Sequence, residues 1–219
     1  MVDVLPEKEC ELLANELSAL HQRRREAAKS RLGGVRNLLR ILPQVADLAH
    51  SPRLQIILNE KLHRTAFPVR ALFFDKTVEA NWHVAWHQDL TIAVVEKIET
   101  PEYIAWSVKE GSVHVQPERR VLEGMAAIRL HLDACNASNG ALKVLPGSHL
   151  HGKLDAAAIK KWTHETNPFV CEIPKGGALL MRPLLLHSSA PSQNPAHRRV
   201  VHIEYATEEL PNGLKWFDC

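Results

Sequence analysis

The spacing of apolar residues along the chain changes near residue 66. Before this point Leu13, Leu17 and Leu20 recur at the i, i+4, i+7 intervals that place side chains on one stripe of an α-helix. The Ser51-Pro52 pair has the residue types that favour a further helix start. The pattern therefore predicts helices over the first part of the chain.

Beyond Phe67 apolar and polar residues alternate over short stretches, which Gly, Pro and Asn separate. Nine such stretches are typical of strands in an antiparallel sandwich, jelly roll or barrel. One further helix is predicted over Asp155–Trp162, between two strands. The predicted strands are Val69–Phe74, Val84–Asp89, Ile92–Glu96, Tyr103–Lys109, Ala126–Asp133, Ala141–Leu145, Phe169–Ile173, Ala178–Met181 and Arg199–Tyr205.

Length and composition fit a single globular domain. The chain has 219 residues, of which 45% are apolar and 24% charged. We expect a mainly β fold with flanking helices: an N-terminal helical cover over 1–65, a β core over 66–206 and a C-terminal tail over 207–219.

Charge and cysteine content exclude several classes of protein. The net charge is +2, so the basic segment 21–40 indicates a solvated helix face rather than a nucleic-acid site. No apolar run is long enough to span a membrane, and the first residues do not resemble an export signal. Four cysteines without CxxC spacing fit reduced thiols. We expect a cytoplasmic protein whose partner is a small molecule, with neither nucleic acid nor membrane.

Two of the 13 histidines stand in a pattern that points to metal chemistry. His87 and Asp89 are two residues apart and share one face of a strand, so both can bind one metal ion. His187 can supply a third ligand, which makes the facial triad of non-haem Fe(II) oxygenases. Arg198 follows His187 by eleven residues and offers a planar fork for a dicarboxylate.

Four motifs together resemble the phytanoyl-CoA dioxygenase family over about residues 65–206. They are His87-x-Asp89, the run NGALKVLPGSH from Asn139 to His149, His187-x-Ser189, and Arg198. The resemblance implies a double-stranded β-helix, which is a cupin-like jelly roll. It also implies an enzyme that uses Fe(II), O2 and 2-oxoglutarate, hydroxylates an unactivated C–H bond and releases succinate and CO2.

The resemblance assigns roles to particular residues. His87, Asp89 and His187 would bind iron, while Arg198 and Ser189 would hold the 5-carboxylate of 2-oxoglutarate. Gln88 and Leu72 match positions that contact this cosubstrate. Arg129 lies on the inward face of a strand, where it would pair with either the cosubstrate or a structural acid. The carboxylate of Asp89 argues against halogenation, because related halogenases have a small residue there.

Other residues have weaker claims to a function. His83, Trp106, His131 and His202 are candidate substrate contacts. The alternative is core packing for Trp106 and His202, and a position before the strand for His83. His149 is expected to be structural. The remaining histidines considered, expected at the surface, are His21, His50, His63, His164 and His197.

Two other functions fit parts of the pattern. A cupin-type metal enzyme that does not use 2-oxoglutarate would need the three ligands but not Arg198. A non-catalytic jelly-roll binding module would need neither. The substrate class is left open, and the absence of a basic signature for CoA phosphates argues against phytanoyl-CoA itself.

Overall fold

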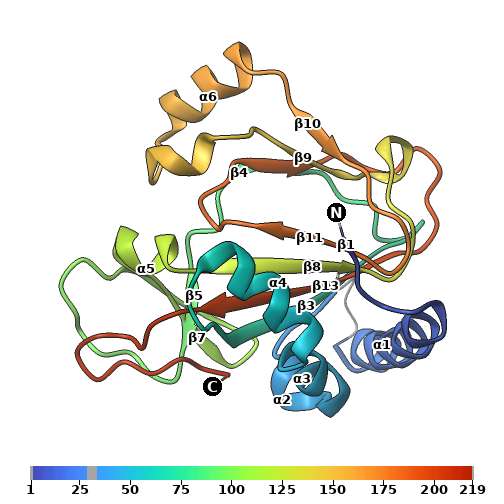
Figure 1. The fold of residues 1–219 in the computed structure, drawn as a ribbon, viewed down its shortest axis with the longest axis horizontal. Helices are drawn as coiled ribbons and strands as arrows, with labels where there is room; N and C mark the ends of the chain where they lie inside the picture. The colour runs from blue at the N-terminus through green and yellow to red at the C-terminus, as the bar shows by residue number, and fades with distance from the viewer. Residues whose placement is uncertain (1, 29–33, 219) are drawn as a thin grey trace.

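The fold is built on a six-stranded antiparallel sheet, here called sheet A. The structure is a computed structural model that describes residues 2–28 and 34–218 (Figure 1). In spatial order, the strands of sheet A are β1 (Val2–Asp3), β11 (Gly177–Met181), β8 (Ala126–His131), β13 (Arg198–Ala206), β3 (Phe67–Lys76) and β2 (Gly34–Val35).

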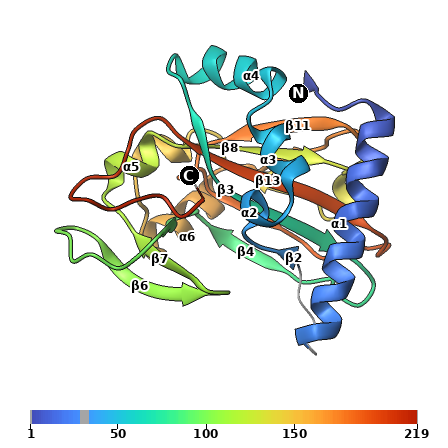
Figure 2. The ribbon, with the colours of Figure 1, turned by 90° about the horizontal axis from the view of Figure 1, so that it is seen from below.

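Two smaller antiparallel sheets complete the β structure. Sheet B lies opposite sheet A in Figure 1, and sheet C forms one end of the molecule in Figure 2. Sheet B has the order β10 (Phe169–Cys171), β9 (Leu142–Val144), β12 (His187–Ser189) and β4 (Val84–His87). Sheet C has the order β5 (Ile92–Val94), β7 (Ser112–Gln116) and β6 (Ile104–Lys109).

Helices from the N-terminal segment cover the outer face of sheet A (Figures 1 and 2). Two shorter α-helices and two 3-10 helices lie in connections between strands. The helices are α1 (Glu7–Ala28), α2 (Leu38–Ile41), α3 (Pro43–Ala49), α4 (Pro52–Leu62), α5 (Arg119–Glu123), α6 (Ala156–Glu165), η1 (Ala137–Asn139) and η2 (Ser148–His151). Among the described residues, none of the helices combines the length and the apolar character that crossing a bilayer requires.

The two faces of sheet A carry different side chains because residues alternate along a strand. On β13, Val201, Ile203 and Tyr205 are fully buried in the core that the helices share with the sheet. The alternate residues His202 and Glu204 face the cavity between the sheets. Alternation thus places apolar side chains in the core beneath the helices and polar side chains in the cavity between sheets A and B.

The expected jelly-roll class is confirmed, and all nine predicted strands coincide with strands of the structure. The predicted inserted helix is α6, and its N-cap Asp155 accepts a hydrogen bond from the amide of Ala158 at 2.8 Å. Sequence patterning missed four strands, β1, β2, β7 and β12, so the helical cover also contains strand residues. Three of these have three or fewer paired residues, too few to establish an alternation.

One histidine lies elsewhere than expected. His21 is only 4% exposed, and its ring meets Phe73 edge-on with 5.8 Å between centroids. The expectation that it lies on the surface was wrong, because α1 turns this residue toward sheet A. His197 is exposed as expected, and its Nδ1 lies 2.8 Å from the Asp75 carboxylate.

The chain's two tyrosines give a matched test of one contact between helix and sheet. The buried Tyr205 hydroxyl donates to the Ala49 carbonyl at 3.0 Å, whereas the buried Tyr103 hydroxyl has no partner among the described residues. We expect Tyr205→Phe to lower the free energy of unfolding by about 1–2 kcal/mol, because it strands the carbonyl. Tyr103→Phe should change it by less than about 0.5 kcal/mol. Urea denaturation measures both, and equal losses would contradict the assignment.

Candidate iron site

Two neighbouring strands of sheet B bring the three predicted ligands together. His187 begins β12 and is paired in register with His87, the last residue of β4. Asp89 follows two residues later, with its carboxylate 3.6 Å from Nε2 of His87 and 3.6 Å from Nε2 of His187. One ligand atom from each residue lies within 4.8 Å of the other two. This is a spacing that one divalent ion can bridge.

Backbone carbonyls fix which ring nitrogen of each histidine faces the site. Nδ1 of His87 lies 2.8 Å from the Ala85 carbonyl, and Nδ1 of His187 lies 2.8 Å from the Leu185 carbonyl. A carbonyl only accepts, so each Nδ1 carries the proton and each Nε2 presents its lone pair. The Asp89 amide donates to the Pro183 carbonyl at 2.9 Å, which fixes the carboxylate's position after the strand.

The electrostatics of the site favour an ionised carboxylate. Burial raises the pKa of Asp89, but the neighbouring His87, His187 and His202 outweigh it and hold the pKa well below its ordinary value. Burial lowers the pKa of His187 to about 4. Burial also lowers the pKa of His87, but the contacts with Asp89 and Ala85 raise it overall. An anionic Asp89 and a neutral His187 are the states in which these groups bind metals.

A cavity of about 270 Å³ connects this triad with the inner face of sheet A. Alternate residues of β3 and β13 form its opposite wall. From β3 come Arg70, Leu72, Phe74 and Lys76; from β13 come Arg198, His202 and Glu204.

Cations without acidic partners occupy one end of the cavity. Nζ of Lys76 donates to Oγ of Ser189 at 2.8 Å and to the Ala190 carbonyl at 2.5 Å. Nη1 of Arg198 donates to the Gly140 carbonyl at 3.0 Å, and its buried Nε has no partner among the described residues. Lys76 is 1% exposed, and burial, with Arg198 nearby, lowers its pKa to about 8. In the described part of the chain, neither cation has a carboxylate within ion-pair distance.

A chain of buried polar side chains runs along the same wall. Nη1 of Arg129 lies 3.1 Å from Nδ1 of His202, and Nε2 of His202 lies 3.3 Å from Oε1 of Glu204. Arg70 also donates to this carboxylate oxygen. Among the described residues no acid pairs directly with Arg129, so the structural-acid alternative for this residue is not observed. Its partner is His202.

Gln88 was expected at the cosubstrate, but the structure gives it another role. Its Nε2 donates to the carbonyls of Gly152 and Leu184 at 2.8 and 2.7 Å, and its Oε1 accepts from the Leu154 amide at 2.8 Å. Strand alternation explains this, because a residue between two ligands on one face must point away from them. Gln88 therefore holds the segments around the metal ligands and does not line the cavity.

The other candidate residues divide into two groups. Leu72, Ser189, Arg129, Arg198 and His202 line the cavity with the triad, whereas His83, Trp106 and His131 do not. His83 is exposed, and Trp106 packs in the apolar cluster of sheet C. Both ring nitrogens of the buried His131 lack hydrogen-bond partners within the described part of the chain. Trp82, Val84 and Lys109 also line the cavity and lie in segments (81–86 and 103–116) that the sequence suggested as pocket-forming. The lining residues that sequence reasoning missed are Arg36, Arg70, Phe74, Lys76, Thr91, Leu142 and Glu204. The sequence did contain a signal for Lys76: it lies four residues after Leu72 on the same strand, and an even spacing places both side chains on one face.

The sequence matches the phytanoyl-CoA dioxygenase (PhyH) family over residues 1–200, so the chain belongs to this family. Together with the triad, this membership defines a non-haem iron oxygenase. Comparison of the sequence with curated proteins gives no match.

Solved structures share the fold at low sequence identity. AviO1 from Streptomyces viridochromogenes Tue57 has a TM-score of 0.68 at 20% identity, over 96% of this chain and 89% of that one. EctD from S. alaskensis has a TM-score of 0.70 at 19% identity, over 94% and 71% of the two chains. Iron-bound HygX from Streptomyces hygroscopicus has a TM-score of 0.63 at 13% identity, over 95% and 83%.

His131 should make the metal-free protein sensitive to acid. Burial, with Arg129 and Arg198 nearby, lowers its pKa to about 3, whereas an unfolded histidine titrates near 6.5. Between these values the unfolded chain binds more protons, so lowering the pH reduces the free energy of unfolding. This residue contributes roughly 1.4 kcal/mol per pH unit at most.

Urea denaturation between pH 7 and pH 5, with a chelator present, measures this dependence. His131→Leu should flatten it, and His164→Leu on the exposed face of α6 should not. Equal slopes for the wild type and His131→Leu would contradict the assignment.

Proposed function

We propose that the protein is an Fe(II)- and 2-oxoglutarate-dependent dioxygenase that hydroxylates an unactivated C–H bond of a small molecule. Succinate and CO2 would be the products from the cosubstrate. The observation that carries the proposal is that one cavity holds both the His87, Asp89 and His187 triad and buried cations for which residues 2–28 and 34–218 supply no acidic partner.

The donor set of the triad fits iron. Two neutral imidazoles and one carboxylate suit Fe(II) and leave other positions on the ion open for ligands. Bound there, iron would supply the oxygen and redox chemistry that protein side chains lack. The residues themselves would keep Nε2 of both histidines and the Asp89 carboxylate aimed at one point, through the carbonyls of Ala85, Leu185 and Pro183.

The cationic end of the cavity supports 2-oxoglutarate as the cosubstrate. Arg198 and Lys76 are 3% and 1% exposed, and burying two cations without an anion is costly. The 5-carboxylate of 2-oxoglutarate would neutralise one charge of this pair, and the Ser189 hydroxyl, 2.8 Å from Nζ of Lys76, would orient it. Arg129, held by His202, would add positive charge beside the same ligand.

The alternatives explain less of the cavity. A cupin-type enzyme without 2-oxoglutarate would use the triad but leave Lys76 and Arg198 buried for no purpose. A binding module without metal would leave the two aligned imidazoles and the ionised Asp89 unexplained.

Anaerobic titration tests the reaction class directly. Fe(II) and 2-oxoglutarate together should give a weak visible charge-transfer band, and admission of O2 should yield succinate. His87→Ala should abolish both while leaving far-UV circular dichroism unchanged, because the ring contributes little to the core. Absence of the band and of succinate in the wild type would exclude the proposal.

Arg198 should act on the cosubstrate rather than on the metal. We expect Arg198→Gln to raise the Kd of 2-oxoglutarate by about tenfold or more, the effect of losing one charge-assisted contact, with unchanged metal affinity. Arg64→Gln, which removes a surface arginine paired with Glu208, is the control. Calorimetry on the Ni(II)-loaded proteins measures both constants, and unchanged cosubstrate binding in Arg198→Gln would contradict the role.

A further inference from the structure

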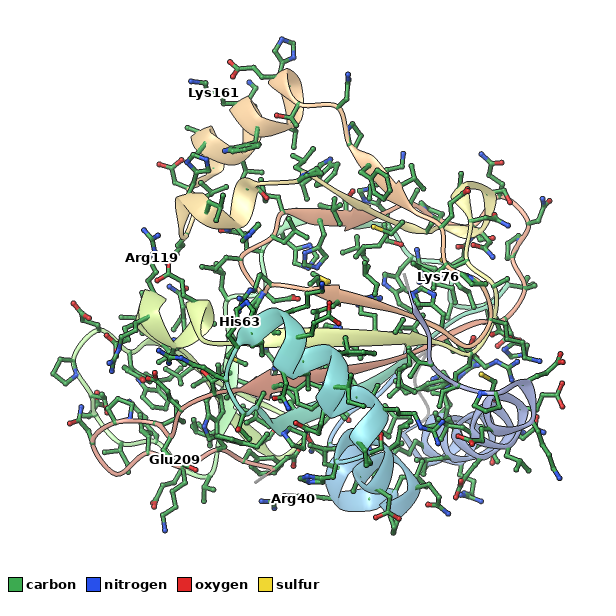
Figure 3. The ribbon with its side chains drawn as sticks, viewed as in Figure 1. Arg40, His63, Lys76, Arg119, Lys161 and Glu209 are labelled. Carbon is green, nitrogen blue, oxygen red and sulfur yellow. The ribbon has the colours of Figure 1, made fainter. Side chains whose placement is uncertain are left out.

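The alternation of β3 gives the cavity two ends. Lys76 and Arg70 lie on the same face of this strand, six residues apart, which corresponds to roughly 20 Å. Antiparallel pairing places Arg198 opposite Lys76 and Glu204 opposite Arg70. The side chain of Lys76 lies between sheets A and B in Figure 3.

The metal ligands lie between these ends. Ser189, two residues after His187, contacts Lys76 at one end. At the other end Arg70 donates to the carbonyl of Thr91, two residues after Asp89, at 3.4 Å. A ligand at the Lys76 end therefore leaves the Arg70 end free.

The Arg70 end is also cationic. Lys109 and Arg36 line the same cavity, and the charges of Arg36 and Arg70 both act on Lys109. Within the described ranges no acid lies at ion-pair distance from Lys109. The buried Nε of Arg70 has no partner among the described residues, although its other nitrogens contact Glu204, Thr91 and His114. Burial, with Arg36 and Arg70 nearby, lowers the pKa of Lys109, so an anion placed there would relieve a repulsion.

The net charge of the side chains that line the whole cavity also favours a second anionic ligand. Six Lys and Arg side chains line it, against the two acids Asp89 and Glu204. Fe(II) and the dianion 2-oxoglutarate would cancel each other and leave this excess unchanged. Glu110 offsets Arg36 through a 3.2 Å ion pair, but both partners are about one-third exposed, which weakens that pair.

A second cavity of about 590 Å³ joins the first between its two ends and shares Arg36, Leu72, Phe74 and Trp82 with it. Nζ of Lys76 lies 5.6 Å from the centre of the Trp82 ring, so this cavity extends from the Arg70 end back toward Lys76. Its volume suits the body of a small organic molecule. Its walls carry the polar side chains of Glu79, Asn81 and Glu110 as well as apolar ones. The apolar part, formed by Leu72, Phe74 and Trp82, lies next to Arg36 and is complementary to the apolar body of a molecule whose acidic group binds the cations.

We propose that the substrate bears a carboxylate or phosphate group, bound among Lys109, Arg36 and Arg70, while its apolar body lies against Trp82 and Phe74. This inference rests on the proposed function for the location of the cosubstrate at the opposite end. Lys109 is the residue to test, because it is exposed at the cavity mouth and can be replaced without disturbing the buried contacts of Arg70.

Three aromatic probes test the site in protein saturated with Ni(II) and 2-oxoglutarate. Calorimetry should show that benzoate or phenyl phosphate binds at least about tenfold more tightly than the neutral benzamide. Whichever of the two anions binds more tightly indicates whether the substrate carries a carboxylate or a phosphate group. Lys109→Gln should weaken anion binding about tenfold and leave benzamide unchanged. Lys161→Gln, remote on α6 in Figure 3, should have no effect.

Several results would overturn the proposal. They are equal binding of anions and benzamide, no binding of either anion to the wild type, an unchanged anion affinity in Lys109→Gln, or displacement of 2-oxoglutarate by the anions. Failure of the proposed function would look different: 2-oxoglutarate would not bind to the Ni(II)-loaded protein, whereas the anions and Lys109→Gln can still be compared without it.

Discussion

The register between β3 and β13 is the constraint on which both the core and the cavity depend. With this pairing, Val201, Ile203 and Tyr205 face the helices, while Arg198, His202 and Glu204 face sheet B. A slip of one residue would exchange the two sets and bury three ionisable groups in the apolar core. On the other side of β13, Arg199 at its start binds Asp133, just beyond the end of β8, at 2.7 Å and so fixes β13 against β8.

Because this register fixes which side chains face the cavity, the charged groups inside it are distributed unevenly. Toward the Arg70 end, Arg129, His202, Glu204 and Arg70 form a connected chain in which one carboxylate contacts Arg70 directly and Arg129 through the imidazole of His202. Among the described residues, the hydrogen-bond acceptors of Lys76 and Arg198 are hydroxyl, thiol and carbonyl groups. Neutral acceptors satisfy hydrogen bonds but do not remove the cost of the buried charge. The buried charges of Lys76 and Arg198 thus lower the stability of the folded protein. An anionic ligand bound beside them would restore it.

Sequence reasoning succeeded where a pattern was local or a motif was complete. Alternation predicted β3, β8 and β13, and the spacing of His87 and Asp89 predicted two ligands that the structure indeed brings to His187. It did not predict β12, since three paired residues show no period, nor that Gln88 must face away from the residues flanking it. The partner of Arg129 was undetermined for a different reason. His202 meets it only through the pairing of β8 with β13, and register is a property of two strands together.

The exposure of the two cationic ends bears on the order in which ligands bind. Lys76 and Arg198 are almost fully buried, whereas Lys109 is exposed and Arg36 about one-third exposed. A ligand that reaches Lys76 would therefore enter from the exposed part of the cavity, where Lys109 and Arg36 lie. A substrate held at the mouth by Lys109 would obstruct that path. If the two ends bind as proposed, the cosubstrate must enter first and the substrate second, so the substrate would close the cavity over the metal and exclude water from it.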